Sequence, residues 1–267
     1  MLRATDIEVS LSRNRILRRV CFEARAGEVS AIVGPNGSGK TTLLRAMTQE
    51  VPFTGSVTLE GADISALPGW QLAARRAVLP QHSRIAFPFT VQEIVRLGMT
   101  ASATPPPPTR AAEALERVGL GGFAGRLYNE LSGGEQQRVQ LARVLTQVWE
   151  PVGPDGPRWL FLDEPVSSLD IGHQLEVMEI MRDFAARGGG VVAVMHDLNL
   201  TAMFADAVTM LAGGGRLAHG APADVFTDAT LSRAYGCALR VNTAPPAPAT
   251  FLLPQSAALP AATPTRI

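Results

Sequence analysis

The chain has 267 residues, of which 46% are hydrophobic, and its formal net charge at pH 7 is zero. This length and apolar content suffice for one globular unit with a sizeable core. The balanced charge and the lack of a basic run both argue against nucleic acid as the main partner. The longest apolar stretches fall short of the roughly 18 residues that span a bilayer, and the first residues lack the apolar centre of a signal peptide. We therefore expect a cytosolic protein, with Cys21 and Cys237 as reduced thiols.

The first chemical signal is a glycine-rich loop between an expected strand and an expected helix. An apolar run at residues 28–33 leads into residues 34–41, Gly-Pro-Asn-Gly-Ser-Gly-Lys-Thr, and residues 42–47 continue at helical spacing. The loop fits the phosphate-binding pattern G-x-x-x-x-G-K-T. Its glycines let backbone N–H groups turn towards phosphates, and the following helix points its positive end at them. A plain glycine turn before a helix is the alternative interpretation.

Within this loop, Lys40 is expected to reach the β- and γ-phosphates of a bound nucleotide, and Thr41 to give its hydroxyl to Mg²⁺. Thr42 is expected to add a contact nearer the α-phosphate. The complete set of expected nucleotide contacts in the loop is Gly34, Pro35, Asn36, Gly37, Ser38, Gly39, Lys40, Thr41 and Thr42.

The region from about residue 91 to 150 has helical periodicity and no convincing strand, so we expect a helical subdomain inserted into the sheet domain. Prolines at residues 105–108 form a stiff extended loop within it. Residues 131–137 read Leu-Ser-Gly-Gly-Glu-Gln-Gln, in which Ser132 and Glu135 fit the S-x-x-E capping box of a helix start. A capping box does not require the two glycines, which leave backbone amides approachable by an anion.

Residues 159–165, Trp-Leu-Phe-Leu-Asp-Glu-Pro, place two adjacent carboxylates at the end of an apolar strand. Alternation along a strand makes the side chains of Asp163 and Glu164 diverge. One carboxylate can hold Mg²⁺ while the other orients the attacking water, so we expect Asp163 in the metal role and Glu164 in the base role. A solvated strand terminus is the alternative, and the phosphate loop favours the functional interpretation.

Further apolar runs at residues 191–195 and 207–211 alternate with helical patterns such as residues 174–186. This alternation predicts an α/β fold with a mixed, mostly parallel sheet and helices on both faces. We expect one domain over residues 1–240, in which sheet-core segments 1–90 and 151–240 flank the helical subdomain of about residues 91–150. The Pro/Gly stretch of residues 150–157 is expected to be irregular. Residues 241–267, rich in Ala, Pro and Thr, are expected to form a flexible tail.

Together, residues 34–41 and 131–137 resemble the two defining motifs of the ATP-binding cassette ATPase subunits, and the resemblance covers about residues 2–238. It implies the RecA-like fold of P-loop NTPases, with ATP and Mg²⁺ as cofactors. In this family the signature string of one subunit completes the ATP site of another. The resemblance therefore implies a homodimer, in which Ser132, Gly133 and Gly134 contact the γ-phosphate of the ATP that the partner holds.

Three further family motifs occur in order. Gln81, in Leu-Pro-Gln-His, is similar to the Q-loop glutamine that reaches Mg²⁺ and the attacking water. Asp170, in Ser-Leu-Asp, resembles the D-loop residue that crosses between subunits. His196, in Met-His-Asp-Leu-Asn, resembles the switch histidine that contacts the γ-phosphate. His82 and His173 lack such support and are interpreted as surface or packing residues.

The resemblance thus implies a catalytic set and a metal set. The catalytic residues are Glu164, His196 and Gln81, and the metal-site residues are Thr41, Gln81 and Asp163.

Within the family, residues 80–91 and 196–206 resemble the ATPases of importers for iron chelates, vitamin B12 and hemin. The extra Pro/Gly segment at residues 151–157 favours the hemin branch, and ferric siderophore or vitamin B12 import is the alternative. The resemblance implies two transmembrane permease subunits, a periplasmic substrate-binding protein and a peripheral position at the cytoplasmic face of the inner membrane. In the family, the segment after Gln81 lines the groove that receives the permease. Phe87 and Phe89 are therefore docking candidates, or else core residues of the insert.

Two departures from the family pattern stand out. Leu11, with Val9 close by, occupies the region where the family usually has an aromatic that stacks on adenine, so we expect adenine to rest on aliphatic surface. Val166 and Ser168 stand where Thr and Ala are common, and neither change removes a catalytic group. A cassette ATPase of ribosomes usually carries two cassettes in one chain, and a DNA-repair cassette carries a long coiled coil. This chain has neither feature, which favours transport.

Overall fold

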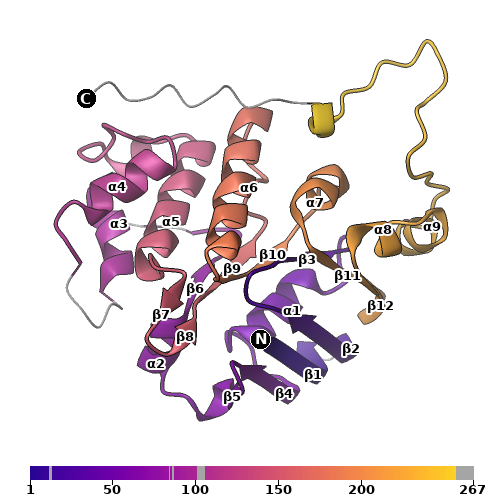
Figure 1. Cartoon of the computed structure of the whole chain (residues 1–267), viewed down its shortest axis with the longest axis horizontal. Helices are drawn as coiled ribbons and strands as arrows, with labels where there is room; N and C mark the ends of the chain where they lie inside the picture. The colour runs from indigo at the N-terminus through magenta and orange to yellow at the C-terminus, as the bar shows by residue number, and fades with distance from the viewer. Residues whose placement is uncertain (12–13, 84, 86, 101–105, 257–267) are drawn as a thin grey trace.

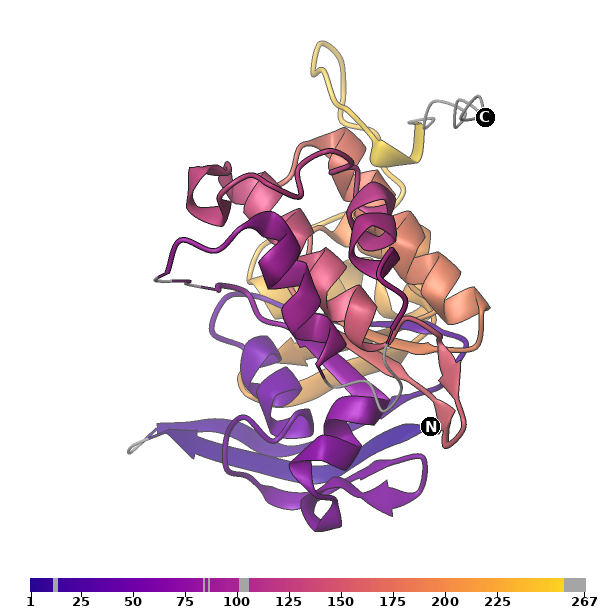
Figure 2. The ribbon, with the colours of Figure 1, turned by 90° about the vertical axis from the view of Figure 1, so that its left-hand side faces the viewer.

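The computed structural model describes residues 1–11, 14–83, 85, 87–100 and 106–256. The chain folds into a central sheet, a smaller antiparallel sheet and layers of helices (Figure 1). In Figure 2, the antiparallel sheet lies at one end of the molecule and the helices of the insert lie at the other. The predicted α/β fold, with a mostly parallel sheet and a helical subdomain, is confirmed.

The central sheet has six strands in the order β12-β11-β3-β10-β9-β6. All neighbours are parallel except β11 and β12, which are antiparallel. Residues of β3, β9 and β10 are buried throughout, as expected for parallel strands that are covered on both faces. The bounds of the strands are β3 Val29–Val33, β6 Arg76–Leu79, β9 Trp159–Asp163, β10 Gly190–Val194, β11 Ala207–Ala212 and β12 Gly215–Gly220.

A four-stranded antiparallel sheet forms from the N-terminal part of the chain, in the order β2-β1-β4-β5. Sequence analysis did not separate this sheet from the central one. Exposed and buried residues alternate along much of β1, because one face of such a sheet can remain in water. The bounds are β1 Leu2–Leu11, β2 Asn14–Ala24, β4 Thr54–Leu59 and β5 Ala62–Asp63.

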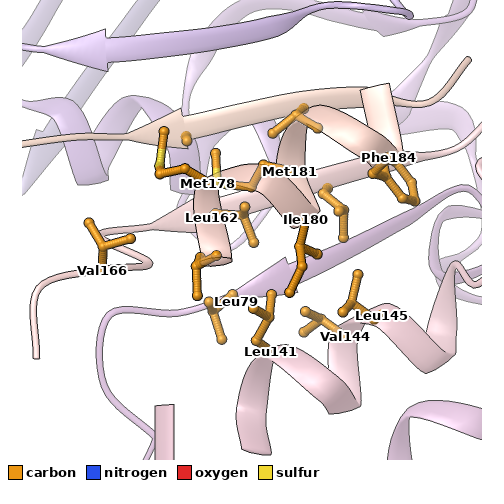
Figure 3. Close-up of a cluster of buried hydrophobic side chains, with 14 of the residues drawn as sticks. Leu79, Leu141, Val144, Leu145, Leu162, Val166, Met178, Ile180, Met181 and Phe184 are labelled. Carbon is orange, nitrogen blue, oxygen red and sulfur yellow. The ribbon is translucent and has the colours of Figure 1, made fainter. Parts of the chain in front are cut away.

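The central sheet separates two hydrophobic cores. On one face, Ile32 and Phe161 pack with helix α1, Lys40–Met47, and with the antiparallel sheet. On the other face, neighbouring residues such as Ala31 and Leu162 pack against helices of the second core. Figure 3 shows this second core, where side chains from β6 and β9 meet those of α5, Gly133–Gln147, and α6, Ile171–Ala186. Helices thus cover the sheet on both faces.

The expected insert contains the helices α3, Val91–Met99, α4, Arg110–Arg117, and α5, Gly133–Gln147. A single isolated β-bridge between Thr90 and Leu127 ties the start of α3 to the segment before α5. The domain boundaries given above stay predictions. Pro105, part of the expected proline loop, lies outside the described residues.

The remaining elements are mostly short. The stretch expected to be irregular contains a small hairpin of β7 and β8, because Gly156 adopts a φ of 103° that allows a tight reversal. Residues 241–256 carry only the short η3, and residues 257–267 lie outside the described part of the chain. No helix among the described residues is long and apolar enough to cross a membrane. These elements are β7 Val152–Gly153, β8 Gly156–Pro157, α2 Gly69–Arg75, α6 Ile171–Ala186, α7 Leu198–Phe204, α8 Pro222–Val225, α9 Asp228–Tyr235, η1 Ile64–Ala66, η2 Tyr128–Glu130 and η3 Pro254–Ser256.

Candidate functional site

The glycine-rich loop lies where strand β3 ends and helix α1 begins, at the carboxyl edge of the parallel sheet. Gly34 has a φ of 145°, and a Cβ there would stand 2.1 Å from the carbonyl oxygen of Leu211. Gly39, with a φ of 99°, would bring a Cβ within 2.5 Å of the Leu17 side chain. Both positions therefore need glycine for backbone conformation and for space. The predicted strand, loop and helix are all present.

Lys40 is the first residue of α1, and its side chain turns back over the loop. Its ammonium donates hydrogen bonds to the carbonyl oxygens of Gly34, at 2.9 Å, and Pro35, at 3.2 Å. Burial lowers the pKa of the Lys40 ammonium, and the nearby carboxylates of Glu164 and Asp163 oppose that shift. A cation held between a glycine loop and two carboxylates is placed to bind a phosphate together with its metal.

Thr41 and Asp163 form the second contact of the site. The hydroxyl of Thr41 donates to the Asp163 carboxylate at 2.9 Å, which joins the start of α1 to the end of β9. A hydroxyl and a carboxylate oxygen side by side suit Mg²⁺, which prefers oxygen ligands and takes few of them from protein. Asp163 is only 2% exposed. Burial, the largest cause, and the neighbouring Glu164 raise the pKa of Asp163, while the Thr41 hydrogen bond lowers it.

Replacing Asp163 with Asn should stabilise the chain when nucleotide and metal are absent. The Asp163 carboxyl has a higher pKa in the folded chain than in the unfolded chain. The free energy of unfolding therefore falls as pH rises through and above the ordinary carboxyl range, and at pH 7 the charged carboxylate still lowers it. The neutral amide removes that penalty and can still accept from Thr41. We expect a melting temperature higher by about 2–4 °C in EDTA, the change that roughly 1 kcal/mol produces at this chain length.

The matched control for this prediction is Asp183→Asn on α6, where the carboxylate is exposed and pairs with Arg117. It should not raise the melting temperature, because no buried charge is removed. Adding ATP and Mg²⁺ should stabilise Asp163→Asn less than it stabilises the unaltered chain. A lower melting temperature for Asp163→Asn in EDTA would contradict the argument from burial.

Glu164 follows β9 directly, and its side chain points away from that of Asp163 to a different partner. A side-chain hydrogen bond joins the Glu164 carboxylate to Nε2 of His196. His196 comes shortly after β10, the strand next to β9, and Asp197 then caps helix α7. The backbone of Glu164 has a φ of 53°, a left-handed conformation that is uncommon for a residue with a side chain. Neighbouring parallel strands thus bring this pair together at one edge of the sheet.

The signature string starts helix α5, with Ser132 as its N-cap. The Ser132 hydroxyl accepts from the amide of Glu135 at 3.3 Å, and the Glu135 carboxylate accepts from the amide of Ser132 at 2.8 Å. The capping box considered above is therefore formed. Hydrogen bonds from the Ser132 hydroxyl and amide lower the pKa of Glu135. Ser132 and Gly133 remain exposed, so the cap does not cover the helix start.

The signature residues and the predicted D-loop aspartate line one concave surface, formed by Ser132, Gly133, Gly134, Glu135, Arg138, Ser168, Leu169, Asp170 and His173. Asp170 caps helix α6 and accepts hydrogen bonds from the amide of His173, at 3.0 Å, and from its ring, at 2.9 Å. The His173 amide is the main reason why the pKa of Asp170 is lowered. None of the residues that line this surface belongs to the phosphate loop.

Gln81 lies in a separate pocket between the sheet domain and the helical insert. Its lining includes Tyr128 and Gln137 from the insert and Ser168 from the segment before α6. The predicted site residues therefore form three groups in one chain. Lys40, Thr41, Asp163, Glu164 and His196 gather at the sheet edge, while the signature group and Gln81 line neighbouring surfaces.

The profile of the family described as "ABC transporter" matches residues 17–167, which is more than half of the chain. The chain belongs to the ABC transporter family. The matched span runs from β2 through the phosphate loop and the signature helix to the residues just after Glu164. The resemblance predicted from the sequence is confirmed.

Curated members of the family with similar sequences carry one description. The chain is 66% identical to "Hemin import ATP-binding protein HmuV" of Jannaschia sp. (strain CCS1), over 96% of this chain and 95% of that one. It is 62% identical to the protein of the same description from Roseobacter denitrificans, over 96% of this chain and 98% of that one. A relative from Rhizobium meliloti, with that description again, is 55% identical.

Solved structures of ABC proteins share the fold of this chain. The ATP-binding subunit of an ABC transporter matches with a TM-score of 0.74 at 22% identity, over 89% of this chain and 94% of that one. The ADP conformation of the cassette MJ1267 matches with a TM-score of 0.73 at 23% identity, over 88% and 98% of the two chains. At these identities the likeness supports the fold alone.

Sequence analysis missed two residues of this ABC cassette that the structure places at the site. Ile16 of β2 lies against the phosphate loop, with its Cγ2 3.6 Å from where a Cβ of Gly39 would stand. Gln137 of α5 donates to the backbone carbonyl of Glu164 at 2.9 Å. Of the aliphatic residues expected near adenine, Val9 is buried in the core, whereas Leu11 is 45% exposed. Val9 therefore offers no surface to a base.

Proposed function

We propose that this chain is the ATP-hydrolysing subunit of an ABC importer for hemin. The observation that carries the ATPase assignment is the convergence of Lys40, Thr41, Asp163, Glu164 and His196 at one edge of the central sheet. The hemin assignment is supported by relatives at 52–66% identity over nearly the whole chain, all described as hemin import ATP-binding proteins. Import of ferric siderophores or vitamin B12 is the alternative to be tested.

At the sheet edge, each residue has a proposed role. The amides of residues 34–39 and the Lys40 ammonium bind the β- and γ-phosphates of ATP, and Thr42 lies towards the α-phosphate. Thr41 and Asp163 would hold Mg²⁺ together with Gln81, and the metal would neutralise charge on the phosphates. Glu164 accepts a proton from the attacking water, and His196 keeps the Glu164 carboxylate oriented and contacts the γ-phosphate.

The signature supports a shared site in a homodimer. Ser132, Gly133 and Gly134 begin a helix whose amides are open to an anion, yet the surface that they line contains no residue of the phosphate loop. We propose that they bind the γ-phosphate of ATP held by a second copy of the chain, with Asp170 at the same interface. Two sites per dimer result from this symmetry. Ile16 and the exposed part of Leu11 are the proposed aliphatic support for adenine.

The importer assignment also requires permease subunits, and we place this chain against them at the cytoplasmic face of the inner membrane. A periplasmic substrate-binding protein would deliver hemin to the permease. The proposed docking segment follows Gln81, and within it Arg84 and Ala86 lie outside the described residues. Phe87 is 71% exposed, whereas Phe89 is partly buried and packs against the second core. The two aromatic side chains therefore have different environments.

Replacing Phe87 with Ser should weaken permease binding and uncouple transport while ATP binding persists. An exposed aromatic anchor can supply a large part of the energy of an interface, and the loss of one costs about 2 kcal/mol or more, roughly a thirtyfold rise in Kd. Affinity for permease subunits in detergent or nanodiscs measures this directly. Unchanged affinity in a folded Phe87→Ser chain would reject the docking role.

Phe89→Ser is the matched variant, since the two rings stand only 6.3 Å apart. The carbonyl of Phe89 accepts from the Tyr128 amide at 2.9 Å, and its ring contacts the core. This substitution should lower the melting temperature, because it removes buried apolar surface. A greater loss of stability from Phe87→Ser than from Phe89→Ser would reverse the two assignments.

The function is tested by reconstituting this chain with its permease and substrate-binding protein in lipid vesicles. Turnover of ATP is measured with hemin, a ferric siderophore or cobalamin bound to the binding protein. Stimulation by hemin, together with hemin uptake into the vesicles, supports the proposal. Stimulation by a siderophore or cobalamin alone would assign the chain to the alternative cargo. An intact complex that never hydrolyses ATP would contradict the ATPase assignment itself.

A further inference from the structure

The backbone of Glu164 is held by more than its own strand. Its amide donates to the carbonyl of Val194, in the neighbouring strand β10, at 3.1 Å. Its carbonyl oxygen faces three donors: Gln137 Nε2 at 2.9 Å, the Ser167 hydroxyl at 3.2 Å and the Ser167 amide at 3.4 Å. Of these, Gln137 makes the shortest bond. The Ser167 donors come from the same turn, whereas Gln137 comes from a different subdomain.

This carbonyl contact matters because the peptide plane sets where the carboxylate points. Glu164 has a φ of 53°, a left-handed conformation that costs free energy for a residue with a side chain and persists only when its surroundings hold it. The bond from Gln137 acts on that residue's own carbonyl group. Rotation of the peptide would move the side chain away from His196, its hydrogen-bond partner. A shift of about 1 Å in a reacting group can cost up to 10²-fold in rate.

Gln137 also lies in helix α5, which starts at the signature. Ser132 is the N-cap of this helix, and Gln137 is on its second turn. The amide oxygen of Gln137 is buried and has no hydrogen-bond partner among the described residues. The hydrogen bond from Nε2 to the Glu164 carbonyl oxygen therefore holds the side-chain amide. A rigid helix thus connects the exposed signature glycines with the backbone of Glu164 in the same chain.

We infer that Gln137 is a positioning residue that couples the signature helix to the general base of its own chain. The inference deepens the proposed function and rests on its shared sites. In such a dimer, Ser132 of one chain binds the ATP of its partner. Gln137 of that first chain fixes the orientation of its own Glu164 carboxylate, which acts on the ATP bound by the first chain. Capture of ATP in one site therefore aligns the base of the other. Gln137 touches neither ATP nor the attacking water.

Replacing Gln137 with Met tests the inference, because Met has nearly the same shape and removes the donor. We expect kcat for ATP to fall roughly tenfold, while KM, ATP affinity and ATP-induced dimer formation without Mg²⁺ stay within about twofold. Gln137→Glu should lower kcat further, since a carboxylate oxygen would then face the Glu164 carbonyl oxygen. The two variants differ from the unaltered residue by little in volume, which limits the effect on folding.

Gln136→Met is the matched control. Gln136 precedes Gln137 in the same helix, and its amide donates to the carbonyl oxygens of Leu131, at 3.0 Å, and Tyr128, at 3.3 Å, both within the insert. The Gln136→Met variant loses equivalent hydrogen bonds to backbone carbonyls but leaves the contact with Glu164 in place. Its kcat should therefore exceed that of Gln137→Met severalfold. An unchanged kcat for Gln137→Met overturns the inference. So does a parallel loss of dimer formation and turnover, which would assign Gln137 to the signature alone. Failure of the unaltered chain to dimerise on ATP would instead refute the shared sites.

Discussion

Replacing Glu164 with Gln should slow ATP turnover by roughly 10²-fold or more while ATP binding persists, since a positioned general base contributes about 10² to 10⁴ to rate. The amide keeps the size of the side chain and can still form a hydrogen bond with His196. It cannot accept a proton from the attacking water. Because hydrolysis is the step that reopens the site, the variant should also accumulate as a closed dimer in ATP and Mg²⁺.

Two measurements check this prediction: steady-state phosphate release, and the dimer fraction after gel filtration in ATP. Glu179→Gln on α6 is the matched control, because Glu179 is partly exposed and pairs with Arg182 in the same helix. Its turnover should stay within about twofold of the unaltered chain, as expected for a surface ion pair. Near-normal turnover in Glu164→Gln would contradict the assignment of Glu164 as the base.

Much of the central sheet follows from local sequence. The runs that become β3, β9, β10 and β11 are mostly apolar, because both of their faces are covered, and the polar residues within them, Ser30 and Thr209, are small and buried. Motif residues lie at or just after the ends of such strands, so their place at the sheet edge follows from the strand itself. Asp163 is the last residue of β9, and His196 is the second residue after β10. The predicted grouping of these residues needed only parallel neighbours, and the structure provides them.

The parts that could not be predicted depend on contacts between distant segments. Phe87 and Phe89 are alike in local sequence, but only Phe89 reaches the core, because its backbone pairs with Tyr128. Gln137 resembles its neighbour Gln136, and only the packing of α5 against the end of β9 distinguishes their partners. Ile16 reaches the phosphate loop because the antiparallel sheet folds under α1. No local pattern marks any of these three contacts.

The separation of the phosphate loop from the signature surface leads to a second large effect, seen when two inactive chains are mixed. Lys40→Ala removes the cation that donates to the loop carbonyls, and Ser132→Arg places a bulky side chain at the exposed helix start. Each homodimer should be inactive, because both of its composite sites carry one defect. In a mixed dimer, one site carries both defects and the other carries neither. Activity should therefore return on mixing.

The size of the recovery follows from random pairing. An equal mixture contains about half mixed dimers, and each has one intact site of two, so activity can reach at most about a quarter of that of the unaltered chain. It should fall below this limit to the extent that the defective site, which captures no ATP, leaves the base of the intact site unaligned. Differently tagged copies, purified in sequence, isolate the mixed dimers and should raise the upper limit to about half. A Lys40→Ala, Ser132→Arg double variant mixed with either single variant is the control, since none of its pairings leaves an intact site. If purified mixed dimers bind ATP and close yet stay as inactive as that control, the proposal that the signature of one chain completes the ATP site of its partner is wrong.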